Sequence, residues 1–286
     1  MRRNYNIENN SFKNVDQYFY IKNQGQNTAT IYLKRTGTSV SHITVQYATE
    51  NPLLKPDTIW KDWTSTNDPG TPVPLSAGST IYIKGNVTTF WSHSSALQWV
   101  GFDSDSETNN IHIGGNIMSL FNNDNFNDVI EFNSNNKGHC GGMFYGFKGL
   151  VSASQLIMPV QVLYSYSYAH MFQECRQLVY PPQIEMREIQ ASSACKYMFY
   201  NCRALKESPI LYPLSHNGKT YCYTNMFQYC TSLKTITMYL ITWGSNNGNV
   251  FSGTPGDGIF YMHRDATWSP TTYALTSGWT YLKVLE

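Results

Sequence analysis

"YMFYNCRALKESP", residues 197–209, and "NMFQYCTSLKTIT", residues 225–237, place Met-Phe, Cys and Leu at the same offsets. Two earlier stretches align with them, "GMFYGFKGL" at 142–150 and "HMFQECRQL" at 170–178. The steps between the four methionines are 28, 27 and 28 residues. So constant a period is typical of a solenoid, in which similar units stack on one another.

The apolar residues of each unit recur at spacings that suit one face of a helical turn, with Phe followed by Cys or Phe and then by Leu. A unit this small cannot cover that face alone, so the next unit must cover it, and each buried Phe or Leu contributes roughly 1.5 to 3 kcal/mol. We therefore expect Phe172, Phe199 and Phe227 to form one continuous column. The segments after each Leu, such as "KESPIL" and "KTITM", suit short strands laid parallel to those of neighbouring units.

Cysteine placement follows the repeat. Cys175, Cys202 and Cys230 share one repeat position, and the other three cysteines come three or four residues before a repeat Met. Free Cys is among the most buried residue types, so this register favours a ladder of buried thiols. Disulfides between same-register cysteines stay open as an alternative, whereas the chain has no CxxC pair and no zinc-ligand spacing. His139 beside Cys140 is only a weak hint of a metal ligand pair.

The amino-acid composition limits the kinds of partner that the protein is expected to bind. The 286 residues carry a net charge of +1 and only 14% charged residues, so electrostatics suggests neither nucleic acid nor an anionic membrane as a partner. No apolar stretch approaches the ~20 residues of a membrane-spanning helix. The 21 tyrosines, in a chain rich in Asn, Ser and Thr, fit an adaptable recognition surface and equally fit packing in a β-rich protein.

Residues 1–17 are polar and aperiodic, which predicts an N-terminal arm that becomes ordered against a partner. They contain two arginines but no apolar run of the kind that a secretory signal peptide needs. We expect the protein to stay in the cytoplasm where it is made unless a larger particle carries it out.

Residues 18–121 have a different pattern, with short apolar-polar alternations separated by turn signals. Alternation is clearest at Ile31 and Leu33 and at Ile81 and Ile83. The fold class expected is mainly β with short helical turns: an antiparallel β-sandwich over 18–121, then a solenoid of about four to five turns with a C-terminal cap over 122–286. The stretch "IHIGGNIMSLF" is interpreted as the hinge between them. The expected front strands are "YFYIKN", "TATIYLKRT", "HITVQYAT", "TIWKDW", "STIYIKGN" and "ALQWVGF".

These units resemble the BspA-like leucine-rich repeat proteins of gut Bacteroidetes and of the phages that infect them, through "ACKYMFYNCRAL" and "YCYTNMFQYCTSL". The front half is similar to the β-domain that usually precedes such repeats, through "ITVQYATENP" and "PLSAGSTIYIKGN", and "GIFYMH" with "LTSGWT" matches the family's ending. The first unit departs from the pattern, with Phe147 in place of Cys. The resemblance implies adhesion and recognition without a catalytic centre.

The sequence contains few candidates for catalytic or metal-binding groups. Asp103, Asp105 and Glu107 alternate in "DSDSE", but the Gly and the distant Glu of an EF-hand loop are missing, so a solvated turn is the favoured interpretation. No HExxH, GxSxG, P-loop or Rossmann glycine pattern occurs. Two well-placed carboxylates would suffice for a glycosidase, and sequence does not exclude them. We expect no enzyme, no catalytic residue, no metal and no cofactor.

Three functional hypotheses follow. The first is a virion-surface protein of a bacteriophage, on the capsid or tail, that recognises a host surface glycan or protein and meets other virion proteins through the arm. The second is a bacterial surface adhesin, and the third is an architectural virion protein. A homo-oligomer is left open. The residues proposed to bind are the variable ones beside the repeat motif, with packing between units as the alternative for the tyrosines: Tyr145, Tyr200, Lys206, Tyr229 and Lys234.

Overall fold

The structure, a computed structural model, describes residues 17–37, 41–67, 70–92, 98–132, 139–212 and 219–284. Over these residues the protein is mainly β, with several sheets and two short helices, α1 (Ser119–Asn122) and the 3-10 helix η1 (Pro270–Tyr273). The predicted arm lies outside the described residues apart from Gln17. The β character expected from the sequence is confirmed.

The front half of the described chain contributes strands to two sheets. All six predicted front strands are present, because their alternating residues point to a shared core; Ile31 and Leu33, and Ile81 and Ile83, are fully buried. Phe19 of one sheet meets Phe102 of the other, with ring centroids 5.6 Å apart. The first sheet contains β1 (Phe19–Asn23), β3 (Thr44–Ala48), β4 (Lys61–Thr64), β7 (Thr80–Gly85) and β10 (Ile111–Asn116); the second contains β2 (Ala29–Arg35), β5 (Thr66–Asn67), β6 (Thr71–Leu75), β8 (Trp91–Ser92) and β9 (Gln98–Ser104).

The proline-containing segment of β6 is not among the expected front strands, yet it pairs antiparallel with β2. Pro72 and Pro74 are exposed while Val73 and Leu75 are buried, and among the described strands β6 pairs with β2 alone. Proline is accepted on an edge strand because its missing N–H then removes no ladder hydrogen bond. The segment is therefore an edge strand despite its two prolines.

One sheet runs from the front half into the repeats. The stretch interpreted as a hinge forms β10 and α1, and β10 pairs in parallel with β11 (Leu150–Met158), which follows the first repeat. In turn β11 pairs in parallel with β13 (Gln183–Ile184). The resulting strand order among the described residues is β13-β11-β10-β1-β7-β3-β4. The division at residue 121 remains a prediction, and the strands continue across it.

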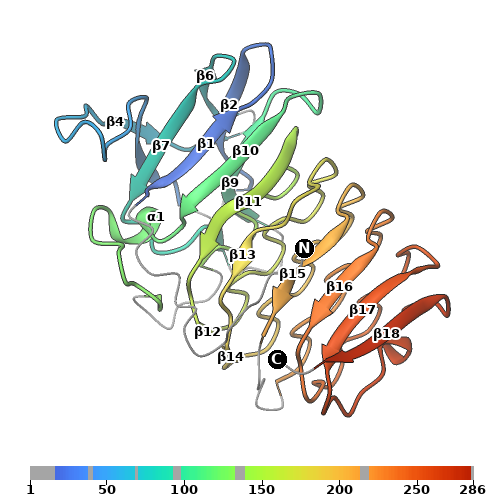
Figure 1. Cartoon of the computed structure of the whole chain (residues 1–286). Helices are drawn as coiled ribbons and strands as arrows, with labels where there is room; N and C mark the ends of the chain where they lie inside the picture. Colours follow the sequence, from blue (N-terminus) through green and yellow to red (C-terminus); the bar gives the residue numbers. More distant parts are fainter. Residues whose placement is uncertain are drawn as a thin grey trace.

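The strands after each repeat Leu lie side by side, as Figure 1 shows in the passage from green to red. A separate sheet, in which all the strands are parallel, contains β15 (Glu207–Leu211), β16 (Thr235–Met238), β17 (Gly258–His263) and β18 (Trp279–Val284). The short strands β12 (Val162–Leu163) and β14 (Glu188–Ile189) pair separately. The extended, parallel segments predicted after Leu205 and Leu233 are confirmed.

The Met-Phe stretches are not helical, which corrects the helical-face interpretation of their spacing. Phe144 donates its N–H to the carbonyl of Met171 in the next unit (3.0 Å), whereas Tyr145 donates to Gly142 within its own unit (2.9 Å). Successive N–H groups thus alternate between a turn inside the unit and a bond to the next one. Every fourth residue has positive φ, which interrupts any helix; in the second to fourth units these are Tyr166, His170, Glu174, Ser193, Tyr197, Asn201, Tyr221, Asn225 and Tyr229.

The expected phenylalanine column is confirmed. The rings of Phe172 and Phe199 have centroids 5.3 Å apart and planes within 1°, and Phe199 and Phe227 are 5.6 Å apart within 7°. The column extends upstream through Phe144 to Phe102 of β9, which lies 6.1 Å from Phe144 and donates its N–H to Met143. Strand β9 therefore serves as the surface on which the first unit stacks.

A fifth stacked unit lacks the sequence motif. Phe227 donates to the carbonyl of Val250, in the bond that earlier units make to Met, and Phe251 stacks 6.2 Å from Phe227. Thr254 takes the position of the ladder Cys. The step from Met226 to Val250 is shorter than the earlier ones.

All six cysteines are free and buried, so the predicted thiol ladder is confirmed and the disulfide alternative is wrong. Cys175, Cys202 and Cys230 donate S–H to the carbonyl of the preceding unit's phenylalanine at 2.8, 3.0 and 3.1 Å. Burial raises the pKa of each of these thiols. They therefore stay protonated at neutral pH, the form in which a thiol is a poor nucleophile and a poor metal ligand.

Candidate recognition surface

Two glycines open the first unit and allow front-half tryptophans to lie on it. A Cβ on Gly141 would stand 2.1 Å from the ring of Trp91, and one on Gly142 would stand 2.8 Å from Trp99. Gly142 also has φ +67°, which glycine adopts without strain. The sequence "GGMF" is thus explained by close contact with these two indoles.

From Trp91 a line of rings crosses the repeat units. Its members are each in contact with the next, at centroid distances of 4.9, 5.0, 5.3 and 5.5 Å. We call it the aromatic row; it consists of Trp91, His170, Tyr197, Tyr200 and Tyr229. Trp91 and His170 are buried, Tyr197 and Tyr200 are half-buried, and Tyr229 is 44% exposed. The far end of the row therefore offers ring surface to solvent, while the near end is a packing contact.

His170, in the buried part of the aromatic row, is neutral. Its Nδ1 lies 2.5 Å from Oε1 of Gln173, and its ring stacks on Tyr197 with planes 16° apart. Burial, aided by the charge of Lys196, lowers the pKa of His170 to about 4. At neutral pH the imidazole is uncharged and behaves as one more aromatic ring.

The three predicted tyrosines do not behave alike. Tyr200 and Tyr229 meet edge to face, 5.5 Å apart, and both belong to the aromatic row. Tyr145 is half-buried and packs on Trp99, with centroids 4.2 Å apart. Burial raises the pKa of both Tyr145 and Tyr200, so their hydroxyls remain protonated donors.

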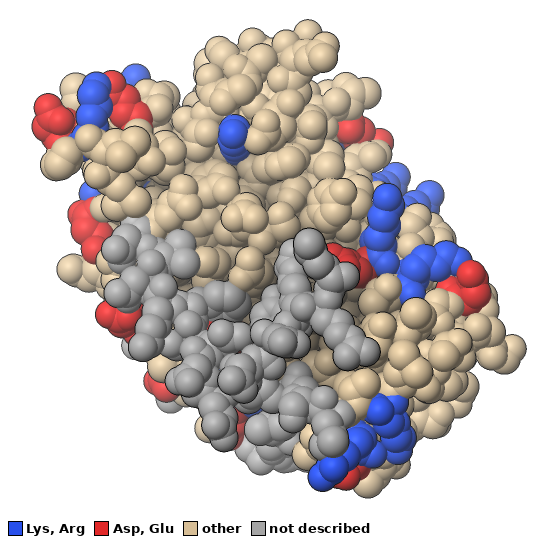
Figure 2. All heavy atoms as spheres, in the orientation of Figure 1, with Lys and Arg blue, Asp and Glu red and all other residues tan. Residues whose placement is uncertain are grey.

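The two predicted lysines lie on the strand side of the same units. Both Lys206 and Lys234 are exposed, directly before β15 and β16. Lys234 forms an ion pair with Asp257. Figure 2 shows blue side chains gathered over the loops that lead into these strands, on a surface that is otherwise largely uncharged.

The polar groups that follow the repeat Phe in the second and third units were not among the predicted site residues. Glu174 accepts from Asn201 (2.6 Å) and pairs with Arg176 (3.0 Å), and Arg203 donates to Asn201 (2.8 Å). The four residues form a hydrogen-bonded chain across two units. Their shared offsets, three and five residues after Met, were visible in the repeat alignment. Trp99 and Tyr197 were missed because neither follows a Met-Phe pair.

The aspartates of the "DSDSE" stretch connect neighbouring segments through an ion pair and hydrogen bonds. Asp103 is 3% exposed, pairs with Lys34 at 2.5 Å and accepts the backbone N–H of Lys148 at 2.8 Å. Asp105 accepts from Thr30 and Asn109. Within the described ranges, no three His, Cys, Asp or Glu side chains come together in a way that would hold a metal ion.

Comparison with family models, curated proteins and solved structures gave no match to this chain. In the part of the chain that the structure describes, no helix combines the length and apolar character needed to cross a membrane.

Proposed function

We propose that this chain is a non-enzymatic interaction protein, built as a front β-sandwich followed by a solenoid of the leucine-rich-repeat kind. The two front sheets share one core through contacts such as Phe19 with Phe102, which supports the sandwich. The phenylalanine column and the hydrogen bonds between successive units support the solenoid. In such an array each unit contacts only its neighbours, so variable residues at one offset line up on a surface.

Within this proposal, the protein is a bacteriophage virion-surface component that recognises a host surface glycan or protein. The observation that carries the recognition role is the exposed end of the aromatic row, where Tyr200 and Tyr229 from successive units are in ring contact. Rigid aromatic side chains provide contact area at little entropic cost. The virion assignment rests on the resemblance of the repeats alone.

The test is cell binding by the labelled full chain, measured by flow cytometry over a panel of gut Bacteroidetes strains. We expect Tyr229→Ala and Tyr200→Ala each to weaken binding about tenfold, which corresponds to ~1.4 kcal/mol for loss of one interface aromatic. Tyr180→Ala is the matched control, because Tyr180 is 49% exposed and lies outside the row. Equal loss in the control variant, or no binding to any strain, would refute recognition through the row. Immunogold labelling of purified phage particles tests the virion assignment.

An architectural virion role is the second candidate, and one observation favours it. The loop before β4 exposes three large apolar side chains, Leu53 (50%), Leu54 (81%) and Ile59 (77%). Apolar residues grouped on one projecting loop suit contact with another protein subunit. Replacing all three with Ser should abolish incorporation into particles if this role holds, and should leave incorporation unchanged if it does not.

A further inference from the structure

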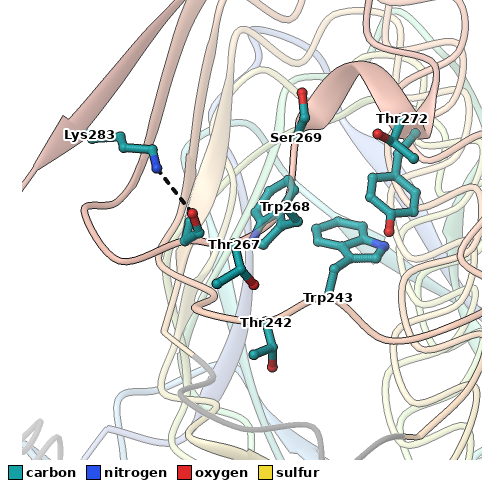
Figure 3. A pocket seen from close by; sticks show the side chains of 9 residues that line it. Thr242, Trp243, Thr267, Trp268, Ser269, Thr272 and Lys283 are labelled. Carbon is teal, nitrogen blue, oxygen red and sulfur yellow. Dashed lines mark hydrogen bonds between the residues drawn. The ribbon is translucent and has the colours of Figure 1, made fainter.

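The C-terminal end of the repeat array carries a hollow of about 730 Å³, within the range of pockets that take small molecules. We call it the terminal groove; Figure 3 shows its lining. It lies between the segments that follow β16 and β17, with η1 and the end of β18. The lining residues are Thr242, Trp243, Ala266, Thr267, Trp268, Ser269, Thr272, Tyr273 and Lys283.

Three aromatic rings form one wall of the groove. Trp243 lies 4.3 Å from Trp268 and 4.4 Å from Tyr273, centroid to centroid. Behind them the fully buried Phe251 and Phe260 give the wall a rigid backing. All three wall residues are only partly buried, so ring surface remains available to a ligand. A flat, preorganised apolar surface of this kind binds with little loss of side-chain entropy.

Hydrogen bonds fix the orientation of the wall and the rim. Trp268 donates its indole N–H to the carbonyl of Leu240 at 2.9 Å, so its ring cannot turn freely. Thr267 donates its hydroxyl to the carbonyl of Ile241 at 3.2 Å, which leaves the oxygen's lone pairs as acceptors. Figure 3 shows the hydroxyls of Thr242, Thr267, Ser269 and Thr272 arranged about the two indoles.

Lys283 provides the charge. Its ammonium donates to the carbonyl of Ala266 at 3.0 Å, the contact drawn as a dashed line in Figure 3, and an ammonium has three N–H donors. Among the described lining residues there is no carboxylate, so the formal charge of the lining is positive. The groove therefore combines an apolar ring face, several hydroxyls and one cation.

We propose that the terminal groove binds an acidic saccharide, with the C–H face of a sugar ring on Trp243 and Trp268 and a sugar carboxylate at Lys283. A pyranose has an apolar face made of axial C–H groups and an edge of hydroxyls that both donate and accept, so it matches this combination of groups. A cationic ligand does not match it, because Lys283 would repel it. This inference deepens the proposed recognition function and rests on it, and it adds a sugar-ring contact in the terminal groove to the contact proposed for the aromatic row.

The experiment uses the folded full chain on an array of immobilised acidic and neutral bacterial saccharides, followed by calorimetric titration with the best ligand. We expect binding to an acidic saccharide that weakens at least tenfold in Trp243→Ala. Lys283→Gln keeps one donor for Ala266 and removes the charge, so it should weaken acidic ligands several-fold and leave neutral analogues unchanged. It also serves as the readout if Trp243→Ala fails to fold. Tyr180→Ala, which changes an exposed tyrosine outside both the terminal groove and the aromatic row, should not change saccharide affinity.

The outcomes separate this inference from the proposed function. If no arrayed saccharide binds, or if the two groove variants bind like the parent chain, the groove assignment is overturned. If cell binding persists and is lost only in Tyr229→Ala, the groove assignment falls and the proposed function stands. Cells treated with periodate should lose binding while protease-treated cells keep it; the reverse result points to a protein receptor and contradicts the saccharide.

Discussion

Gly146→Ala is the sharpest test of the left-handed turn geometry on which the stacking depends. Gly146 lies three residues after the first repeat Met and has φ +63°. An added Cβ would meet no atom within 4 Å, so steric overlap plays no part in the expected effect. In the folded protein, the substitution therefore costs only the free energy of placing an L-residue in the left-handed region, about 1 to 2 kcal/mol. Alanine also restricts the unfolded chain, which offsets about 0.4 to 1 kcal/mol. We expect a net loss of about 1 kcal/mol.

The matched control is Gly248→Ala. Gly248 also has no atom within 4 Å of an added Cβ, but its φ lies outside the left-handed range, and the equivalent residue of the second unit is Ala169. Only the unfolded-state term applies there, so this variant should gain about 0.4 to 1 kcal/mol. The two glycine-to-alanine changes are thus expected to have opposite signs although both sites have open space.

Urea unfolding, followed by both tryptophan fluorescence and circular dichroism, measures the difference between the two variants. Coincident transitions from the two probes are required before midpoints are converted to free energies. Gly146→Asn should cost less than Gly146→Ala, because Asn tolerates left-handed φ and Asn201 holds the same position in the third unit. Equal stability of the Gly146→Ala and Gly248→Ala proteins would refute the geometry.

Three further outcomes are expected. All six cysteines should resist a thiol reagent in the native protein and react on unfolding, because each is buried; rapid native labelling of several thiols would contradict the ladder. Asp103→Asn should lower the free energy of unfolding by about 3 kcal/mol, since it leaves the partly buried Lys34 without its counter-ion, as measured by urea unfolding. The pKa of His170 is about 4 in the folded protein and 6.5 in the unfolded chain, so the unfolded state takes up the proton first. The free energy of unfolding should therefore fall by roughly 3 kcal/mol as the pH drops from 6.5 to 4. In His170→Asn this part of the pH dependence should disappear, and an unchanged profile would show that another group titrates.

The repeat motif predicted the fold features that depend on burial. Phe172, Phe199 and Phe227 were expected in one column because apolar residues at a fixed interval must be covered by their neighbours, and the rings do stack. The same logic placed Cys175 and its counterparts in the core. The backbone path of the turns was not predictable, because spacings of three and six residues fit a helix as well as they fit a chain of turns with left-handed residues. Four to five turns were expected, but the motif did not locate the fifth, because Val250 and Thr254 keep the positions of Met and Cys without keeping the motif.

The candidate sites were less predictable than the core, since exposure depends on what packs from outside the unit. Tyr145 and Tyr200 share an offset, yet Trp99 of the front half covers Tyr145 and no front-half strand reaches Tyr200 among the contacts of the described residues. No repeat alignment contains that information. The terminal groove was invisible to the same alignment, because Trp243, Trp268 and Lys283 come from segments that lie beyond the last Met-Phe motif and meet only when β16, β17 and β18 are stacked.

The aromatic row and the terminal groove follow from one property of a stacked array. Interior units have their apolar faces covered on both sides, so aromatic residues stay available only along the lateral surface or at the final unit. On the lateral surface the exposed area of each ring is limited by neighbouring rings four to six ångströms away, which is why Tyr200 is only partly exposed while Tyr229 is 44% exposed.

At the final unit no further repeat covers the Trp243 and Trp268 wall in the described chain, and a cation and several hydroxyls border it. An aromatic wall beside hydrogen-bonding groups favours a ligand with one apolar face and a polar edge, whereas a lateral row of phenols favours a broad, shallow contact. The two surfaces are therefore expected to differ in ligand size, and separate variants in each can resolve their contributions.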